Sequence, residues 1–334
     1  MNKDLLRKLY RTNAISNIIN LLGRPWRGCG AILVYHRVLP DRLIEQDLGV
    51  GLAVTESNFD KQIKFLKEKY DLVSIDNFIE KLNDKNKKKF FLTITFDDGY
   101  KDNLNFALPI LEKYKVPSTI YYTTKFLDQH VSLWWYELKE IINKNSSLDF
   151  TYKNEKFSFK LNDENLKKIA FNSVRKIFLK LKSNDQIKLL ELISNSKNRK
   201  NYSNLCLDKK DLEQLSNNTL ITIGAHTHDH LNLKILNEKE AISDISKSAE
   251  IIESIIKKKV KHFAYPYGGI EQAGKREYDI IKNLNFKSGV TSVAYPVNSN
   301  KLFSLPRINV AKNANEKEIQ NHLSGFYNLA YKFL

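Results

Sequence analysis

Residues 90–100 of the chain read FFLTITFDDGY, an apolar and β-branched run that ends in two adjacent carboxylates and a glycine. The run predicts a buried strand over residues 90–96, because aromatic and β-branched side chains favour that conformation. Neighbouring side chains of a strand face opposite ways, so Asp97 and Asp98 can share one site only if the strand breaks at Asp97, which Gly99 permits. The alternative is that Asp-Asp-Gly is an ordinary turn or helix cap.

A short apolar run followed by a helical pattern recurs along much of the chain. We expect strands at residues 31–38, 71–74, 90–96, 117–122, 220–224, 262–265, 287–290 and 305–310, and helices at residues 58–70, 103–114, 238–258 and 278–284. Strand–helix–strand units with crossovers of this length form parallel β-structure. The number of units favours an α/β barrel, whose site lies at the C-terminal ends of the strands.

Residues 134–215 interrupt this alternation. They begin with Trp134-Trp135-Tyr136, continue with an alternating stretch at residues 150–159, and end in Lys-rich amphipathic patterns near residues 164–182 and 185–195. We predict an inserted, mainly helical subdomain in a barrel formed by residues 31–133 and 216–312, followed by a C-terminal helix over residues 313–334. The three aromatic residues either form a wall on which a sugar ring stacks or, more commonly for such residues, pack in the core.

The composition is that of a globular protein. The 334 residues include 12 Gly, 7 Pro and 2 Cys, which excludes a fibrous chain, a disulfide framework and a thiolate metal site. The formal net charge is +16, but 44 of the 54 basic residues are lysines, whereas bidentate phosphate recognition favours arginine. We therefore expect a solvated basic surface and no specific nucleic-acid partner.

Residues 1–30 intersperse basic and apolar side chains. A basic amphipathic helix on an anionic membrane fits this pattern, and so does a helix that packs across the barrel. Ser16, Asn17 and Asn20 interrupt the apolar run that a signal peptide requires, and no stretch approaches the roughly 18 apolar residues of a membrane span. We therefore expect a cytoplasmic protein, with peripheral membrane contact through residues 1–30 as an open alternative.

Three of the seven histidines, His226, His228 and His230, follow the predicted strand at residues 220–224. A helical turn would put His226 and His230 on one face, at a spacing suited to one metal ion, whereas an extended segment would pair His226 with His228. Either arrangement predicts a metal site. Two imidazoles and one Asp oxygen leave a coordination position for water, as in catalytic sites, and the second carboxylate is then free to act as a base.

The segment Phe263-Ala264-Tyr265-Pro266-Tyr267-Gly268-Gly269 also follows a predicted strand. Its Pro and Gly residues predict a tight loop with backbone N–H groups that suit an oxyanion. Residues 95–100, the histidine cluster and this loop, in that order, resemble the NodB-type polysaccharide deacetylases of carbohydrate esterase family 4. The likeness runs from about residue 32 to residue 310, and residues 34–38 and 305–310 resemble the branch that includes poly-N-acetylglucosamine deacetylases and deacetylases of surface-polysaccharide gene clusters.

The resemblance implies a distorted (β/α)7 barrel of the NodB type. It implies a hydrolase that removes N-acetyl groups from an N-acetylated sugar of a polysaccharide or glycan intermediate. Asp98, His226 and His230 are implied as ligands of one divalent metal ion, with Zn²⁺ favoured over Co²⁺, Ni²⁺ or Mn²⁺. Asp97 is implied as the general base, and Tyr267 as the donor of a backbone N–H to the oxyanion.

Two features of many family members are missing from this sequence. Ala264 stands where they have an arginine that holds the base, and no late Leu-x-His motif supplies the acid. The branch resemblance implies His36 as the acid and Arg307 as the cation that orients Asp97. The alternatives are a core histidine bonded to backbone and a structural salt bridge. Thr227 is implied to support the histidine loop.

Two rival functions stay open. The first is a non-catalytic glycan-binding barrel that keeps the metal, and the second is a hydrolase of the same fold that acts on a non-sugar amide or cyclic imide. Acetate release from N-acetylated oligosaccharides separates the first from an enzyme. Loss of activity confined to sugar substrates in Trp134 or Trp135 variants would support a glycan substrate over the second.

Overall fold

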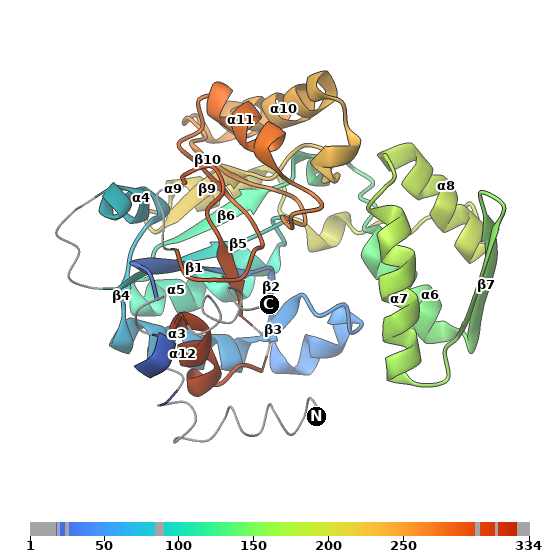
Figure 1. Ribbon diagram of the computed structural model, residues 1–334, viewed down its shortest axis with the longest axis horizontal. Coiled ribbons are helices and arrows are strands. Elements are labelled where there is room, and N and C mark those ends of the chain that lie inside the picture. The colour runs from blue at the N-terminus through green and yellow to red at the C-terminus, as the bar shows by residue number, and fades with distance from the viewer. Residues whose placement is uncertain are drawn as a thin grey trace.

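The computed structural model describes residues 27–83, 90–297, 301–310 and 313–325, together with residue 18 and residues 21–23. Seven parallel strands form a nearly closed barrel with helices outside it (Figure 1). A parallel bridge between Val290 and Leu305 joins the two ends of the sheet. The strand order is β11 (Ser288–Val290), β10 (His262–Ala264), β9 (Ile221–Ala225), β6 (Ser118–Tyr122), β5 (Phe91–Phe96), β1 (Gly30–Tyr35) and β12 (Arg307–Asn309). The α/β barrel predicted from the sequence is confirmed.

The register of the strands brings their C-terminal ends together. All six residues of β5 are buried, and β5 pairs with β1 so that Phe96 lies opposite Tyr35. Phe96 also lies opposite Ile120 of β6, and β6 pairs Tyr122 with Ala225 of β9. The loops that follow β1, β5 and β9 therefore meet at one end of the barrel, where barrel enzymes carry their chemistry.

The helices outside the barrel begin where local capping predicts. Helix α10 starts after Asn237, whose side chain accepts the Glu240 N–H while the Glu240 carboxylate accepts the Asn237 N–H, which is a capping box. The helices around the barrel are α3 (Glu56–Lys69), α4 (Ile75–Asn83), α5 (Leu108–Tyr114), α9 (Lys209–Asn217), α10 (Glu238–Ile256), α11 (Lys275–Asn283) and α12 (Glu316–Leu323).

Shorter elements complete the barrel, and several were not predicted. The expected helix at residues 103–114 divides into a wide π-type turn, η3 (Asn103–Ala107), and α5. The short strand β4 (Asp71–Leu72) pairs with the start of β5, and β2 (Arg37–Leu39) pairs with β3 (Ala53–Thr55). The 3₁₀ turns are η2 (Asp41–Asp47), η4 (Thr124–Leu127), η5 (Ser203–Leu205) and η6 (Leu233–Ile235).

The segment from α6 to α8 lies to one side of the barrel (Figure 1). It contains α6 (Trp134–Lys144), β7 (Ser147–Tyr152), β8 (Glu155–Lys160), α7 (Glu164–Phe178) and α8 (Ser183–Ser194). The alternating stretch at residues 150–159 belongs to an antiparallel hairpin, whose turn residues Lys153 and Asn154 both have positive φ, as two-residue hairpin loops require. The predicted boundary at residue 215 falls inside α9, which packs against β9; the division into domains stays a prediction.

Most of the basic segment at residues 1–30, and the predicted C-terminal helix beyond residue 325, lie outside the described residues. Among the described residues, none of the helices has the length and apolar character needed to cross a lipid bilayer.

Candidate active site

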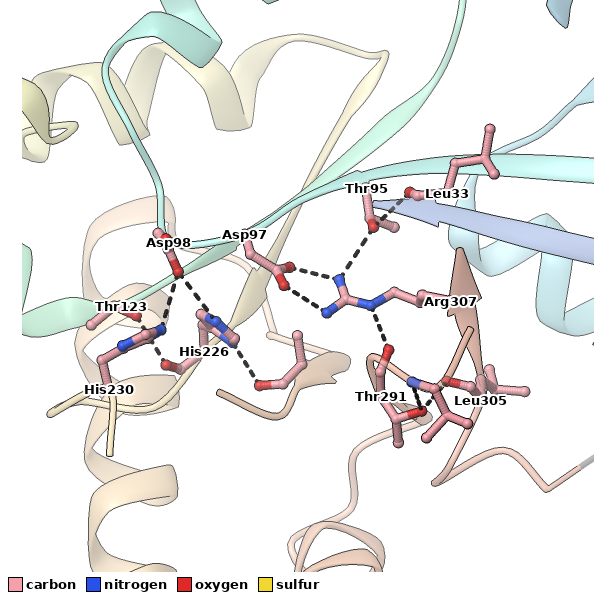
Figure 2. A network of polar contacts seen from close by, with 12 residues as sticks. Leu33, Thr95, Asp97, Asp98, Thr123, His226, His230, Thr291, Leu305 and Arg307 are labelled. Carbon is pink, nitrogen blue, oxygen red and sulfur yellow. Dashed lines mark hydrogen bonds and ion pairs between the residues drawn. The ribbon is translucent and has the colours of Figure 1, made fainter. Parts of the chain in front are cut away.

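Strand β5 ends at Phe96, and the chain then turns sharply. Asp98 has a φ of +73° and Gly99 a φ of +87°, a region that glycine enters without strain. A Cβ atom at position 99 would lie 2.2 Å from Tyr122 Cδ2, so only glycine fits here. The turn sends the two carboxylates toward different partners, as Figure 2 shows: Asp98 faces two histidines and Asp97 faces an arginine.

Asp98, His226 and His230 form a compact group of potential metal ligands. The Asp98 Oδ1 atom lies 3.4 Å from His226 Nε2 and 3.1 Å from His230 Nε2, and one ligand atom from each residue lies within 4.8 Å of the others. The three residues are 3%, 1% and 8% exposed. The end of β5 and the end of β9 thus supply one carboxylate and two imidazoles to the same buried point.

The loop at residues 226–230 is neither the helical turn nor the extended segment considered from the sequence. Thr227 and His230 have φ values of +66° and +53°, and the His230 N–H donates to Thr227 Oγ1 over 3.0 Å. These left-handed residues fold the chain back, which brings His226 and His230 together. His228 points elsewhere, toward Thr124 and Lys247, so the His226/His228 pair does not form.

The tautomer of His226 fits a metal ligand. Its Nδ1 atom lies 2.8 Å from the Ala264 carbonyl oxygen, which can only accept, so Nδ1 carries a proton and Nε2, which faces Asp98, is the ring nitrogen left for a metal ion. Burial alone would lower the pKa of His226, but the charges of Asp97 and Asp98 raise it, so a positive charge is favoured at this point. A carboxylate oxygen opposite nitrogen lone pairs requires a proton or a cation between them. Burial lowers the pKa of His230, which favours its unprotonated form. The donor set therefore suits a divalent cation.

Asp97 is held by a buried arginine. Arg307 donates from Nη1 and Nη2 to the two Asp97 oxygens, each over 2.6 Å, and from Nε to the Thr291 carbonyl over 2.9 Å. Burial alone would raise the pKa of Asp97, but the charge and hydrogen bonds of Arg307, together with the neighbouring His226, bring the pKa below its usual value. Asp97 is therefore ionised, and each carboxylate oxygen has a further lone pair with which to accept a proton.

His36 and Tyr267 come from the ends of two other strands. His36 directly follows Tyr35, the last residue of β1, and the Tyr35 carbonyl accepts the Asp97 N–H over 3.1 Å, so the backbone at His36 lies beside that of Asp97. Tyr267 follows β10 with a φ of +61°, and its ring centroid lies 4.8 Å from that of His230. Within the described residues, its backbone N–H has no hydrogen-bond acceptor. All seven predicted catalytic and metal-ligating residues therefore lie at or near one end of the barrel.

The two tryptophans pack in the core rather than offering open faces to a sugar. Trp134 and Trp135 are 4% and 7% exposed, and Trp134 stacks on Phe178 with a centroid distance of 4.6 Å. Both residues also line a cavity of about 140 Å³ beside His230, together with side chains of α8 and of the loop at residues 125–132. Of the two alternatives considered from the sequence, packing in the core describes both tryptophans, and a sugar-stacking wall does not.

Sequence reasoning missed the Ala264 carbonyl that orients His226. Any residue supplies a carbonyl, so the sequence carries no signal for this partner. It also missed that residues 134–136 make polar contacts with the loops of the site, because their partners lie far away along the chain.

A model of the polysaccharide deacetylase family matches residues 84–287, and the chain belongs to this family. A poly-beta-1,6-N-acetyl-D-glucosamine N-deacetylase of Staphylococcus aureus (strain MRSA252) is 31% identical over 140 residues, which cover 39% of this chain and 47% of the relative. The matched part thus spans about half the length of that relative.

Two solved structures share the fold. The Streptococcus pyogenes deacetylase PplD in complex with acetate superposes with a TM-score of 0.59 at 20% identity, covering 88% of this chain and 97% of the other. IcaB from Ammonifex degensii gives a TM-score of 0.57 at 16% identity, covering 89% and 97%. The NodB-type barrel expected from the resemblance is confirmed.

Proposed function

We propose that the protein is a metal-dependent deacetylase that removes N-acetyl groups from an N-acetylated sugar of a polysaccharide or glycan intermediate. The observation that carries the proposal is the Asp98, His226 and His230 group next to an ionised Asp97. The similarity to an enzyme named for the N-deacetylation of poly-beta-1,6-N-acetyl-D-glucosamine supports this class of substrate.

Asp98, His226 and His230 would hold the metal ion, and the nitrogen-rich donor set favours Zn²⁺, with Co²⁺, Ni²⁺ or Mn²⁺ as alternatives. A divalent ion in such a site polarises the amide carbonyl and lowers the pKa of a bound water molecule toward about 7. Asp97, kept ionised by Arg307, accepts the proton of the attacking water.

Two further groups complete the proposed reaction. The free backbone N–H of Tyr267 donates a hydrogen bond to the oxyanion that forms at the acetyl carbonyl. His36 donates a proton to the sugar nitrogen, because an amine leaves readily only when it is protonated. The products are acetate and a free amino sugar.

Acetate release from β-1,6-linked N-acetylglucosamine oligosaccharides, measured with added Zn²⁺, tests the proposal. We expect Asp97→Asn to retain zinc and to lose activity by roughly 10² to 10⁴-fold. We expect His230→Ala to lose zinc, as measured by elemental analysis after dialysis. His228→Ala is the matched control from the same loop and retains zinc, since His228 contacts Thr124 and Lys247 instead.

An Asp97→Asn enzyme with normal turnover would exclude the base assignment. A zinc-loaded wild-type protein that binds the oligosaccharide without releasing acetate would favour the glycan-binding scaffold. Hydrolysis of simple amides or cyclic imides but not of N-acetylated sugars would favour the non-sugar hydrolase.

A further inference from the structure

The first turn of α6 contacts a different loop of the candidate site with each of its three residues, 134–136. These residues belong to the segment beside the barrel, and all three side chains are buried. Each also has a polar atom bonded to another residue far away in the sequence. Core packing alone explains the burial but not this pattern of partners.

Trp135 contacts both loops that carry the metal-ligand group. Its Nε1–H donates to Tyr100 Oη over 3.1 Å, and Tyr100 is two residues beyond Asp98. Its ring centroid lies 5.3 Å from that of His230. The Nδ1 atom of His230 is buried without a hydrogen-bond partner among the described residues, unlike that of His226. Ring packing therefore replaces the hydrogen bond that normally orients a ligand histidine.

Trp134 contacts the loop after β10. Its Nε1–H donates to Tyr267 Oη over 3.3 Å, and the Tyr267 ring packs against the His230 ring, with centroids 4.8 Å apart. Phe178 of α7 stacks on the Trp134 ring at an interplanar angle of 3°. The Trp134 indole thus packs on α7 of the inserted segment and at the same time donates a hydrogen bond to Tyr267 of the barrel.

Tyr136 contacts the segment after β1. Its Oη accepts a hydrogen bond of 2.9 Å from Arg37 Nη1, and Arg37 Nε donates to Asp102 over 2.7 Å. Asp102 also accepts the Val38 N–H. Arg37 is the residue after His36, so this buried network determines where the chain that carries His36 leaves the barrel.

We propose that residues 134–136 are the positioning element of the site, with Trp135 orienting His230 and Tyr136 orienting the segment that carries His36. The inference rests on the proposed function, since it assigns support to the same site. The three contacts come from one helical turn, so a shift of α6 would move all of these loops together. The inserted segment therefore sets the geometry of the barrel's C-terminal end.

Single conservative variants of the full chain test the proposal, because each contact serves a different loop. We expect Trp135→Phe, which loses the Tyr100 hydrogen bond and part of the ring packed on His230, to weaken zinc affinity by roughly tenfold in a chelator competition. We expect Tyr136→Phe to keep zinc affinity within about twofold and to lower kcat by roughly tenfold, because its network supports His36 rather than the ligands.

Tyr202→Phe is the matched control. Tyr202 lies against Tyr136, with ring centroids 6.0 Å apart, but its buried hydroxyl has no hydrogen-bond partner among the described residues. Removing this hydroxyl changes neither zinc affinity nor kcat. The proposal would be overturned if Trp135→Phe, Tyr136→Phe and Tyr202→Phe lost the same thermal stability and showed no separate effects on zinc affinity and kcat. Residues 134–136 would then contribute only to core packing.

Amide hydrogen exchange of the metal-free protein separates this inference from the proposed function. We expect faster exchange at residues 226–230 in Trp135→Phe and at residues 36–38 in Tyr136→Phe, with neither change in Tyr202→Phe. A wild-type protein that binds no zinc would sink the proposed function but leave this measurement intact. If residues 226–230 and residues 36–38 exchanged at wild-type rates in both Trp135→Phe and Tyr136→Phe, the positioning role would be excluded.

Discussion

At the scale of single residues, Asp97 and Asp98 are chemically identical and adjacent, yet they lie in different environments. Asp98 Oδ1 lies between two imidazole nitrogens, 3.4 Å from His226 Nε2 and 3.1 Å from His230 Nε2. Asp97 lies against the Arg307 guanidinium, which donates one hydrogen bond from each Nη atom to the two carboxylate oxygens. The first environment suits a metal ligand, and the second suits a base that is ionised and oriented.

The buried pair of Asp97 and Arg307 leads to a stability prediction. Arg307→Met leaves a buried carboxylate without its partner, and we expect the free energy of unfolding to fall by about 3 to 5 kcal/mol in urea titrations. The double variant Asp97→Asn/Arg307→Met removes both charges and should recover much of this loss. A single variant as stable as wild type would show that Asp97 has another counter-charge.

Asp244 leads to a pH prediction. Its carboxylate accepts the Asp229 N–H, and burial raises its pKa to about 6, with Asp229 adding to this effect and Lys125 opposing it. The folded state therefore binds the Asp244 proton more tightly than the unfolded state does. The protonated carboxyl makes its full contribution to the free energy of unfolding below about pH 4, and this contribution is lost as the pH rises through about 6.

Asp244→Asn should accordingly raise the free energy of unfolding at pH 7.5 by up to about 3 kcal/mol and have a smaller effect at pH 4. Denaturant titrations at both pH values measure this. The exposed residue Asp185 offers the control Asp185→Asn, which should change little at either pH. An equal effect of Asp244→Asn at both pH values would contradict the assignment.

At the scale of elements, the site depends on how strands end. Asp98, Thr227, His230 and Tyr267 are non-glycine residues with positive φ, and such strained residues are held only where the surrounding structure overdetermines them. They follow β5, β9 and β10, whose register brings those ends together. At Asp98 and His230, the positive φ belongs to turns that bring the two side chains within 3.1 Å of each other.

Gly99 provides a test of the turn after β5. Gly51 has nearly the same φ, +88°, but no atom within 4 Å of an added Cβ, whereas at Gly99 the Cβ would meet the Tyr122 ring. We expect Gly51→Ala to cost about 1 kcal/mol for backbone strain alone, and Gly99→Ala to cost about 3 kcal/mol because the clash adds to it. Equal losses in thermal unfolding would mean that the Tyr122 ring moves aside freely.

At the scale of the whole molecule, the barrel supplies the reactive groups and the segment from α6 to α8 lies against them. The potential ligand atoms come from the loops after two separate strands, β5 and β9, and Trp135 of α6 packs against His230. Binding of a metal ion should therefore stabilise the folded protein as a whole rather than one loop.

Zinc addition tests this linkage. At roughly 100 times the dissociation constant, the ion should stabilise the protein by about 2.7 kcal/mol, and Tm should rise by about 4 °C in a thermal-shift measurement. A chelator should reverse the rise. His226→Ala should show no rise, and a rise of equal size in that variant would mean that zinc binds elsewhere.

The sequence alone determined the barrel class and the approximate limits of many of its elements. These depend on the spacing of apolar residues and on caps within a few positions, as at Asn237, and such local signals do not require knowledge of distant partners. The sequence also identified the candidate residues, since Asp97, Asp98 and the histidine cluster follow predicted strands.

Only the tertiary structure decided which carboxylate faces the histidines, which two of the three histidines converge, and what Trp134 and Trp135 contact. The reason is physical. The direction of a side chain after a strand depends on backbone angles such as the positive φ of Asp98 and His230. The turns that contain them are joined to distant parts of the chain, because Leu207 donates its N–H to the Gly99 carbonyl and Thr124 donates its N–H to the Thr227 carbonyl, and no local pattern encodes such partners.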